Sequence, residues 1–202
     1  VVQASLPVFW YTLDMATARQ PQFVTPEEYL EIQRTAEIRS EYISGEMYEM
    51  ATPSRAHSQI KVNLASEVRQ ALRNQQCEGG AELAVAARGS YLVPDLTIYC
   101  NGGEFSGQKD VLDNPVVVFE ILSPSTDDFD HGHKWNLYQL IPSLMHYVMI
   151  AQASPAAEIY SRVSERFWQY EAVTSLDGII RLPHIELELP LISLYERVSF
   201  PV

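Results

Sequence analysis

A glutamate, Glu120, stands within an otherwise apolar run that spans residues 116–122 and reads VVVFEIL. Pro115 precedes the run and Ser123-Pro124 follows it. Such a short run, rich in β-branched and aromatic side chains, is typical of a strand that is buried on both faces. An unpaired carboxylate is costly there, so Glu120 needs a cation, a hydrogen-bond network or a metal as its partner.

The chain has 202 residues, of which 47% are hydrophobic and 20% are charged, as in ordinary globular proteins. We expect one domain over residues 25–197, an N-terminal extension over residues 1–24 and a tail over residues 198–202. No apolar run approaches the roughly 20 residues that span a bilayer, and no secretory signal pattern opens the chain. We therefore expect a cytoplasmic protein with no membrane contact. In that location Cys77 and Cys100 should be free thiols.

The formal net charge of −12 argues against a general nucleic-acid coat protein. Non-specific affinity for nucleic acid comes mainly from Lys and Arg side chains that neutralise phosphates. The charge does not exclude a nuclease, because a site that collects carboxylates for a metal is itself acidic.

Capping residues and apolar periodicity predict three main helices, at residues 26–38, 53–72 and 128–141, and a short closing helix at residues 191–197. A hairpin is expected around Ser44-Gly45, and alternation predicts further strands at residues 91–99, 116–122, 144–151, 157–163, 167–173 and 179–182. The helix between the strands at 116–122 and 144–151 makes a crossover, so these two strands should be parallel. The expected fold class is a mixed α/β domain.

A second carboxylate, Asp95, follows Pro94 directly and precedes Glu120 by 25 residues. That spacing allows the two residues to lie on neighbouring strands. Two like charges in a core need a cation between them, and hard oxygen ligands suit Mg²⁺, with Mn²⁺ as a substitute. The alternative is that Asp95 only caps a turn after Pro94.

Lys134 is the candidate cation. Strand alternation puts Leu122 on the same face as Glu120, and Leu122 cannot stabilise charge on a phosphate. Lys134 shares a helical stripe with Leu137 and Tyr138, so it should point toward the sheet. The alternative is a surface pair with Asp130, four residues earlier.

Several other side chains are candidates for outer positions around this site. His57 begins the apolar stripe of the second helix and therefore faces inward, either as a site residue or as an ordinary core histidine. Glu46 and Glu82 are further candidates for outer or third-ligand positions, or else solvated strand residues. His131 and His133 form a pair without a further ligand at zinc spacing, so we set zinc aside.

These segments together resemble a bacterial family of restriction-endonuclease-like proteins, long a domain of unknown function, within the PD-(D/E)XK nuclease superfamily. The resemblance rests on the segment VPDLTI around Asp95, on VFEILSPST around Glu120, on DHGHK ending at Lys134, and on Tyr138. The opening segment TPEEYL from Thr25 and the hairpin segment EYISGE also match.

The resemblance implies a restriction-endonuclease-like mixed β-sheet flanked by helices, with an additional antiparallel C-terminal hairpin. It implies that Asp95 and Glu120 bind Mg²⁺, that Lys134 replaces the usual lysine of the motif, and that the protein cleaves DNA. Nucleases of this type often act as homodimers. His133 departs from the acidic residue usual in the family. Two alternatives stay open: a catalytically silent binding or scaffold domain, which the small number of Lys and Arg residues favours, and a hydrolase of small phosphoesters, which suits an acidic surface.

Overall fold

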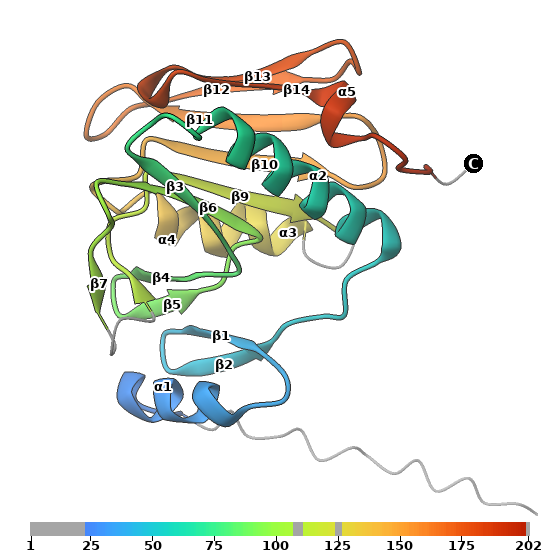
Figure 1. Ribbon diagram of the computed structural model, residues 1–202. Helices are drawn as coiled ribbons and strands as arrows, with labels where there is room; N and C mark the ends of the chain where they lie inside the picture. Colours follow the sequence, from blue (N-terminus) through green and yellow to red (C-terminus); the bar gives the residue numbers. More distant parts are fainter. Residues whose placement is uncertain (1–22, 107–110, 124–126, 201–202) are drawn as a thin grey trace, which may run out of the picture.

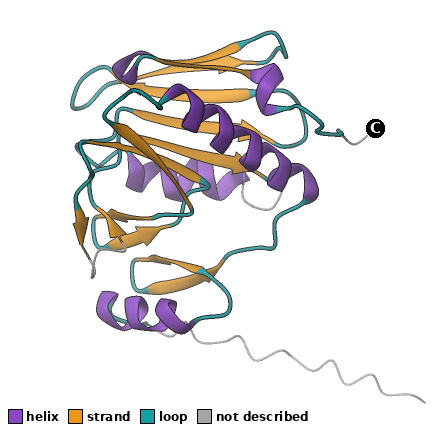
Figure 2. Ribbon diagram, in the orientation of Figure 1, coloured by secondary structure: helices purple, strands orange, loops and turns teal. Residues whose placement is uncertain are grey.

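The computed structural model describes residues 23–106, 111–123 and 127–200, so most of the N-terminal extension expected at residues 1–24 lies outside the described part. It has two six-stranded sheets and a two-stranded sheet, with helices packed around them (Figures 1 and 2). The helices are α1 (Pro26–Thr35), α2 (Arg55–Ala71), α3 (Asp127–Phe129), α4 (Trp135–Tyr138) and α5 (Leu191–Leu194). Within these residues no helix is both long and apolar enough to cross a membrane.

The six-stranded sheet with the longer strands, called the larger sheet below, is mixed and has the strand order β12-β11-β10-β9-β6-β3. Its strands are β3 (Cys77–Ala81), β6 (Leu96–Cys100), β9 (Val117–Leu122), β10 (His146–Ala151), β11 (Ala157–Arg162) and β12 (Trp168–Val173). The strands β9 and β10 are parallel, as the crossover pattern predicts, and the other neighbours are antiparallel. All six residues of β9 are buried, which confirms the interpretation of the run around Glu120.

The second sheet has the order β2-β1-β5-β4-β8-β7. Its strands are β1 (Ser40–Ile43), β2 (Glu46–Glu49), β4 (Ala84–Ala87), β5 (Ser90–Leu92), β7 (Phe105–Ser106) and β8 (Val111–Leu112). The predicted hairpin is confirmed as β1 and β2, with β2 at the sheet edge, and Ser44 and Gly45 take positive φ angles in its turn. The strands β13 (Ile179–Leu182) and β14 (Leu187–Pro190) form a separate antiparallel hairpin.

Each face of the larger sheet has its own core. Phe119 and Ile121 of β9 pack in one core with Ile60, Leu64 and Val68 of α2, and the β13–β14 hairpin covers the same face. Val118 and Leu122 pack in the other core with Tyr138 of α4 and with residues of the second sheet. Figure 1 shows α2 on one side of this sheet and α3 and α4 on the other. Glu120 belongs to the second side because its neighbours in the strand alternate.

Several predicted elements differ from the structure. The strand expected at residues 91–99 is two strands, β5 and β6, which belong to different sheets. Pro94 lies between them, where its missing N–H costs no ladder hydrogen bond. The first helix ends at Thr35 instead of residue 38, because Ala36 is already extended. The closing helix ends at Leu194 instead of residue 197.

The prediction of free thiols is wrong, because Cys77 and Cys100 form a disulfide. The two cysteines are direct partners in the antiparallel register of β3 and β6. That register brings their Cα atoms to 3.9 Å, close enough for the sulfur atoms to bond. No pattern in the sequence indicates this pairing, since β3 is a glycine-containing strand that alternation does not predict.

Candidate active site

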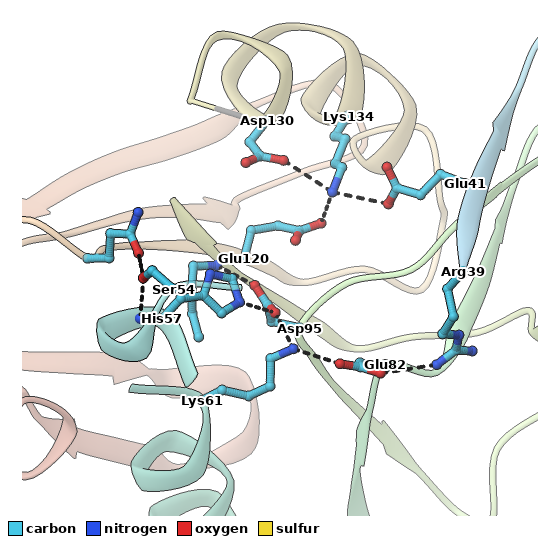
Figure 3. Close-up of polar contacts among 12 residues, drawn as sticks. Arg39, Glu41, Ser54, His57, Lys61, Glu82, Asp95, Glu120, Asp130 and Lys134 are labelled. Carbon is cyan, nitrogen blue, oxygen red and sulfur yellow. Dashed lines mark hydrogen bonds and ion pairs between the residues drawn. The ribbon is translucent and has the colours of Figure 1, made fainter. Parts of the chain in front are cut away.

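The candidate site lies at the bottom of a pocket of about 600 Å³ between the two sheets and α2. Its walls include Asp95, Glu120 and Lys134, together with Glu41 and Asp130. Glu120 is 4% exposed, Asp95 6% and Lys134 7%, so the charged groups sit deep in the pocket. Figure 3 shows these side chains converging from the sheets and from the helical segment that carries Lys134.

Asp95 lies directly before the first residue of β6, beside β9. The register of the two strands pairs Leu96 with Phe119, so Asp95 comes next to Glu120. The backbone N–H of Ile121 donates to Oδ2 of Asp95 at 2.8 Å, and this side-chain acceptor replaces the strand partner that β6 no longer offers. The predicted placement of the two carboxylates on neighbouring strand positions is therefore what the structure shows.

The other oxygen of Asp95 is held by two groups on α2. Oδ1 lies 2.8 Å from Nε2 of His57 and 2.7 Å from Nζ of Lys61. These two residues are one helical turn apart and share one side of the helix. Burial raises the pKa of Asp95, but the hydrogen bond from His57 and the ion pair with Lys61 outweigh it and leave the pKa below its usual value. Asp95 is therefore held ionised.

Lys134 joins three carboxylates. Its Nζ lies 3.1 Å from Oε1 of Glu120, 3.1 Å from Oε1 of Glu41 and 3.2 Å from Oδ1 of Asp130. Burial lowers the pKa of Lys134, but these carboxylates outweigh it and raise the pKa well above its usual value. Lys134 thus points toward the sheet as predicted. It also pairs with Asp130, but this pair is buried and is not the surface pair of the alternative interpretation.

A change in helix geometry brings Lys134 and Asp130 to this point. The segment predicted as one helix over residues 128–141 contains a π-helical turn at Asp130–Lys134, between α3 and α4. The N–H of Trp135 donates to the carbonyl of Asp130, which is the i→i+5 pattern of a π-helix. Single π-helical turns within helices occur often at functional sites.

Glu120 has a different electrostatic environment from Asp95. Burial raises its pKa well above the usual value, and Lys134 only partly offsets this because Asp130, Asp95 and Glu41 also lie nearby. The hydroxyl of Tyr138 donates to Oε1 of Glu120 at 3.0 Å. An added positive charge next to Glu120 would lower its pKa and favour the ionised carboxylate.

The outer candidates divide into two groups. His57 contacts Asp95, and Glu82 lies one step further, with Oε1 2.8 Å from Nζ of Lys61. Arg39 holds the other oxygen of Glu82 at 3.3 Å. Glu46 is not brought to the site: it lies at the turn end of β2, does not line the pocket and accepts a hydrogen bond from Tyr48.

Two residues of the site were missed in the sequence. Lys61 looks like one of several cations on a solvated helix, but its spacing of four residues from His57 was a usable signal. Glu41 looks like an ordinary strand residue. Its Oε1 accepts the N–H of Val93 at 2.9 Å, so it joins β1 to the chain segment that leads into Asp95. No pattern in the sequence predicts the contact between Glu41 and Val93.

The oxygen atoms of the site suit one divalent metal ion that prefers oxygen ligands, such as Mg²⁺. Four buried carboxylates, at Glu41, Asp95, Glu120 and Asp130, face only two lysines in the pocket, Lys134 and Lys61. With all four carboxylates ionised, two formal negative charges are left over, and a divalent ion would neutralise them. Oδ1 of Asp130 is buried and has no hydrogen-bond donor, only the ion pair with Lys134.

Within the described ranges, no three side chains of His, Cys, Asp or Glu are arranged to hold a metal by themselves. Mg²⁺ is often bound by one or two carboxylates and keeps several waters, so Asp95 and Glu120 are a sufficient pair. A metal at Asp95 would have to compete with Lys61 and His57 for Oδ1.

Comparison with known proteins places the chain in a family. Two uncharacterized proteins of Synechocystis sp. (strain ATCC 27184 / PCC 6803 / Kazusa), slr1290 and sll1609, are 28% identical over 183 residues and 29% identical over 158 residues. These matches cover 88% and 76% of this chain and 94% and 89% of the two relatives.

The fold matches that of a crystal structure from Anabaena variabilis ATCC 29413, described as a "putative nuclease belonging to DUF820". The TM-score is 0.72 at 21% sequence identity, and the match covers 87% of this chain and 99% of that one. Residues 26–191 match the model of the Uma2 family, described as "Putative restriction endonuclease". The chain therefore belongs to the Uma2 family.

Proposed function

We propose that this protein is a metal-dependent endonuclease that hydrolyses phosphodiester bonds in DNA. The observation that carries the proposal is the excess of buried carboxylates over lysines around Asp95 and Glu120 at the bottom of an open pocket. Buried carboxylates that crowd around one lysine in a cleft, with pKa values moved by burial and by their charged neighbours, are candidates for a functional site. The membership in a family described as restriction endonucleases supports the same reading.

Asp95 and Glu120 would hold Mg²⁺, with Mn²⁺ as a substitute, through one carboxylate oxygen each. Such an ion, when bound, supplies a water of lowered pKa and polarises the phosphate. His57 and the N–H of Ile121 orient the Asp95 carboxylate, and Tyr138 orients that of Glu120. Outer contacts of this kind fix the direction of metal-binding oxygens.

Lys134 would stabilise negative charge that develops on the phosphate oxygens in the transition state. Its ammonium group lies 3.1 Å from Oε1 of Glu120, so it would stand beside a phosphate that binds a metal held by Glu120. Fixed positive groups in a site that excludes water stabilise such charge strongly. Glu41 and Asp130 keep Lys134 protonated and fix its position.

The test is calorimetric titration of Mg²⁺ and Mn²⁺ into wild type and Asp95→Asn, with cleavage of supercoiled and single-stranded DNA measured on the same samples. Asp95→Asn keeps the side-chain shape and should lose both metal binding and cleavage. Asp113→Asn, an exposed aspartate outside the pocket, is the matched control and should behave as wild type. Wild type that binds neither ion would refute the proposal.

A further inference from the structure

An aromatic stack stands at the mouth of the pocket. Tyr48 of β2 contacts Phe129 at the end of α3, with ring centroids 5.5 Å apart, and Phe129 stacks on His133 at 5.3 Å with ring planes 29° apart. We call these three residues the rim stack. Tyr48 and Phe129 line the same pocket as Asp95 and Glu120.

Tyr48 is the accessible member of the rim stack that also lines the pocket. It is 39% exposed although its ring contacts that of Phe129. Its hydroxyl donates to Oε2 of Glu46 at 2.8 Å, so the ring is fixed in direction at its polar end. A rigid, half-exposed aromatic face beside a reactive site can accept a flat ligand.

The depth of the carboxylates limits what can reach them. Asp95 and Glu120 are 6% and 4% exposed, so a phosphate must enter the pocket to reach them. A base next to that phosphate would then lie at the pocket mouth. In a duplex that base is paired and stacked inside the helix, whereas an unpaired base is free to stack on an aromatic side chain.

The charge of the chain supports the same conclusion. Binding to duplex DNA depends mainly on neutralising phosphates along both strands. This chain has 14 Lys and Arg residues against 26 Asp and Glu residues, so that source of affinity is small. Stacking on aromatic rings is a source of affinity that needs no positive charge.

We infer that the rim stack binds an unpaired nucleobase, and that the substrate of this site is a single-stranded or locally unpaired segment of DNA. The inference rests on the proposed nuclease function and names its substrate class. The base adjacent to the scissile phosphate stacks on Tyr48, while the phosphate lies at Asp95 and Glu120. Phe129 contacts the ring of Tyr48, and His133 in turn stacks on Phe129.

The test uses a single-stranded oligonucleotide that carries one 2-aminopurine, whose fluorescence is quenched by stacking on an aromatic ring. The protein carries Glu120→Gln so that the strand stays intact, and the same sequence is also titrated as a duplex. We expect tighter binding of the single strand and quenching of the fluorophore. Equal affinity for the two forms, or no quenching, overturns the inference.

Variants of Tyr48 assign the effect to the ring. Tyr48→Ala should weaken single-strand binding about tenfold and abolish the quenching, because stacking on one aromatic side chain is worth roughly that factor or more. Tyr48→Phe keeps the ring and should retain the quenching. Tyr170→Ala removes a tyrosine that is 53% exposed on β12, away from the pocket lining, and serves as the matched control. Single-strand affinity in Tyr48→Ala equal to that of the control refutes a role for Tyr48.

The outcomes separate this inference from the proposed function. Binding and quenching without any metal-dependent cleavage by wild type would leave a nucleotide-binding site and remove the nuclease activity. Cleavage of duplex and single strands at equal rates, with no effect of Tyr48→Ala, would leave the nuclease and remove the inference. Thermal unfolding of each variant checks that the fold is intact.

Discussion

Lys61 occupies the position that a metal ion on Asp95 would need, and its removal should therefore increase metal affinity. Its Nζ lies 2.7 Å from Oδ1 of Asp95, and the side chain is 18% exposed. The variant Lys61→Met keeps the length and the apolar stem of the side chain but removes the ammonium group. We predict that this variant binds Mn²⁺ more tightly than wild type, although it has lost a residue of the site.

The magnitude follows from the contacts that are broken. A hydrogen bond to a charged group contributes roughly 1.5–3 kcal/mol to stability. In wild type the displaced ammonium group can keep its second contact, at 2.8 Å from Oε1 of Glu82, so only part of this energy opposes the metal. We therefore take the lower end, about 1.5 kcal/mol, which corresponds to a roughly tenfold lower dissociation constant.

The assay is calorimetric titration of Mn²⁺ at pH 7 and low ionic strength. Lys61→Arg, which keeps the charge, should stay near wild type. Arg69→Met removes one positive charge from an exposed position on the same helix and controls for the change in net charge. A dissociation constant for Lys61→Met that is equal to or higher than that of Arg69→Met would refute the reasoning.

Three further predictions concern stability. Lys134→Met leaves buried carboxylates without their cation and should lower the free energy of unfolding by about 3–5 kcal/mol in urea denaturation at pH 7. A urea midpoint equal to that of wild type would contradict the ion-pair geometry. Reduction of the Cys77–Cys100 disulfide, or Cys77→Ser with Cys100→Ser, should cost about 3 kcal/mol, because the closed loop spans a separation of 23 residues; equal thermal midpoints with and without reductant would count against it. Burial and His184 lower the pKa of His146 to about 4, so the unfolded chain binds a proton that the folded chain does not. Stability should therefore fall by about 3 kcal/mol from pH 6.5 to 4, and His146→Gln should flatten that profile.

Local patterns predicted the elements that carry the site. The apolar stripe of α2 repeats every four residues, and the run around Glu120 is apolar on both sides, so each pattern has one interpretation. The parallel pairing of β9 with β10 followed from the helix between them. These features depend on residues that are close in the sequence.

Features that depend on distant pairing were not predictable in this way. Alternation continues across Pro94, so it does not reveal that the chain passes from one sheet to the other at that residue. The disulfide depends on the register of β3 with β6, and the sequence of neither strand indicates that the two strands pair. The ion pair of Lys134 with Glu41 joins residues 93 positions apart, on elements whose relative position is set by the second sheet.

The site shows why a buried charged residue can be recognised in a sequence whereas the residues that pair with it cannot. Glu120 could be singled out because its neighbours are apolar, whereas Lys61 and Glu41 stand among ordinary polar residues. Their role comes from residues 93–95, where the chain crosses from β5 to β6 and leaves the N–H of Ile121 in β9 to the Asp95 carboxylate. That crossing opens the pocket between the two sheets and gathers the carboxylates of three separate strand segments there. The passage of the chain from one sheet to the other at Pro94, which alternation does not predict, therefore also brings the residues of the site together.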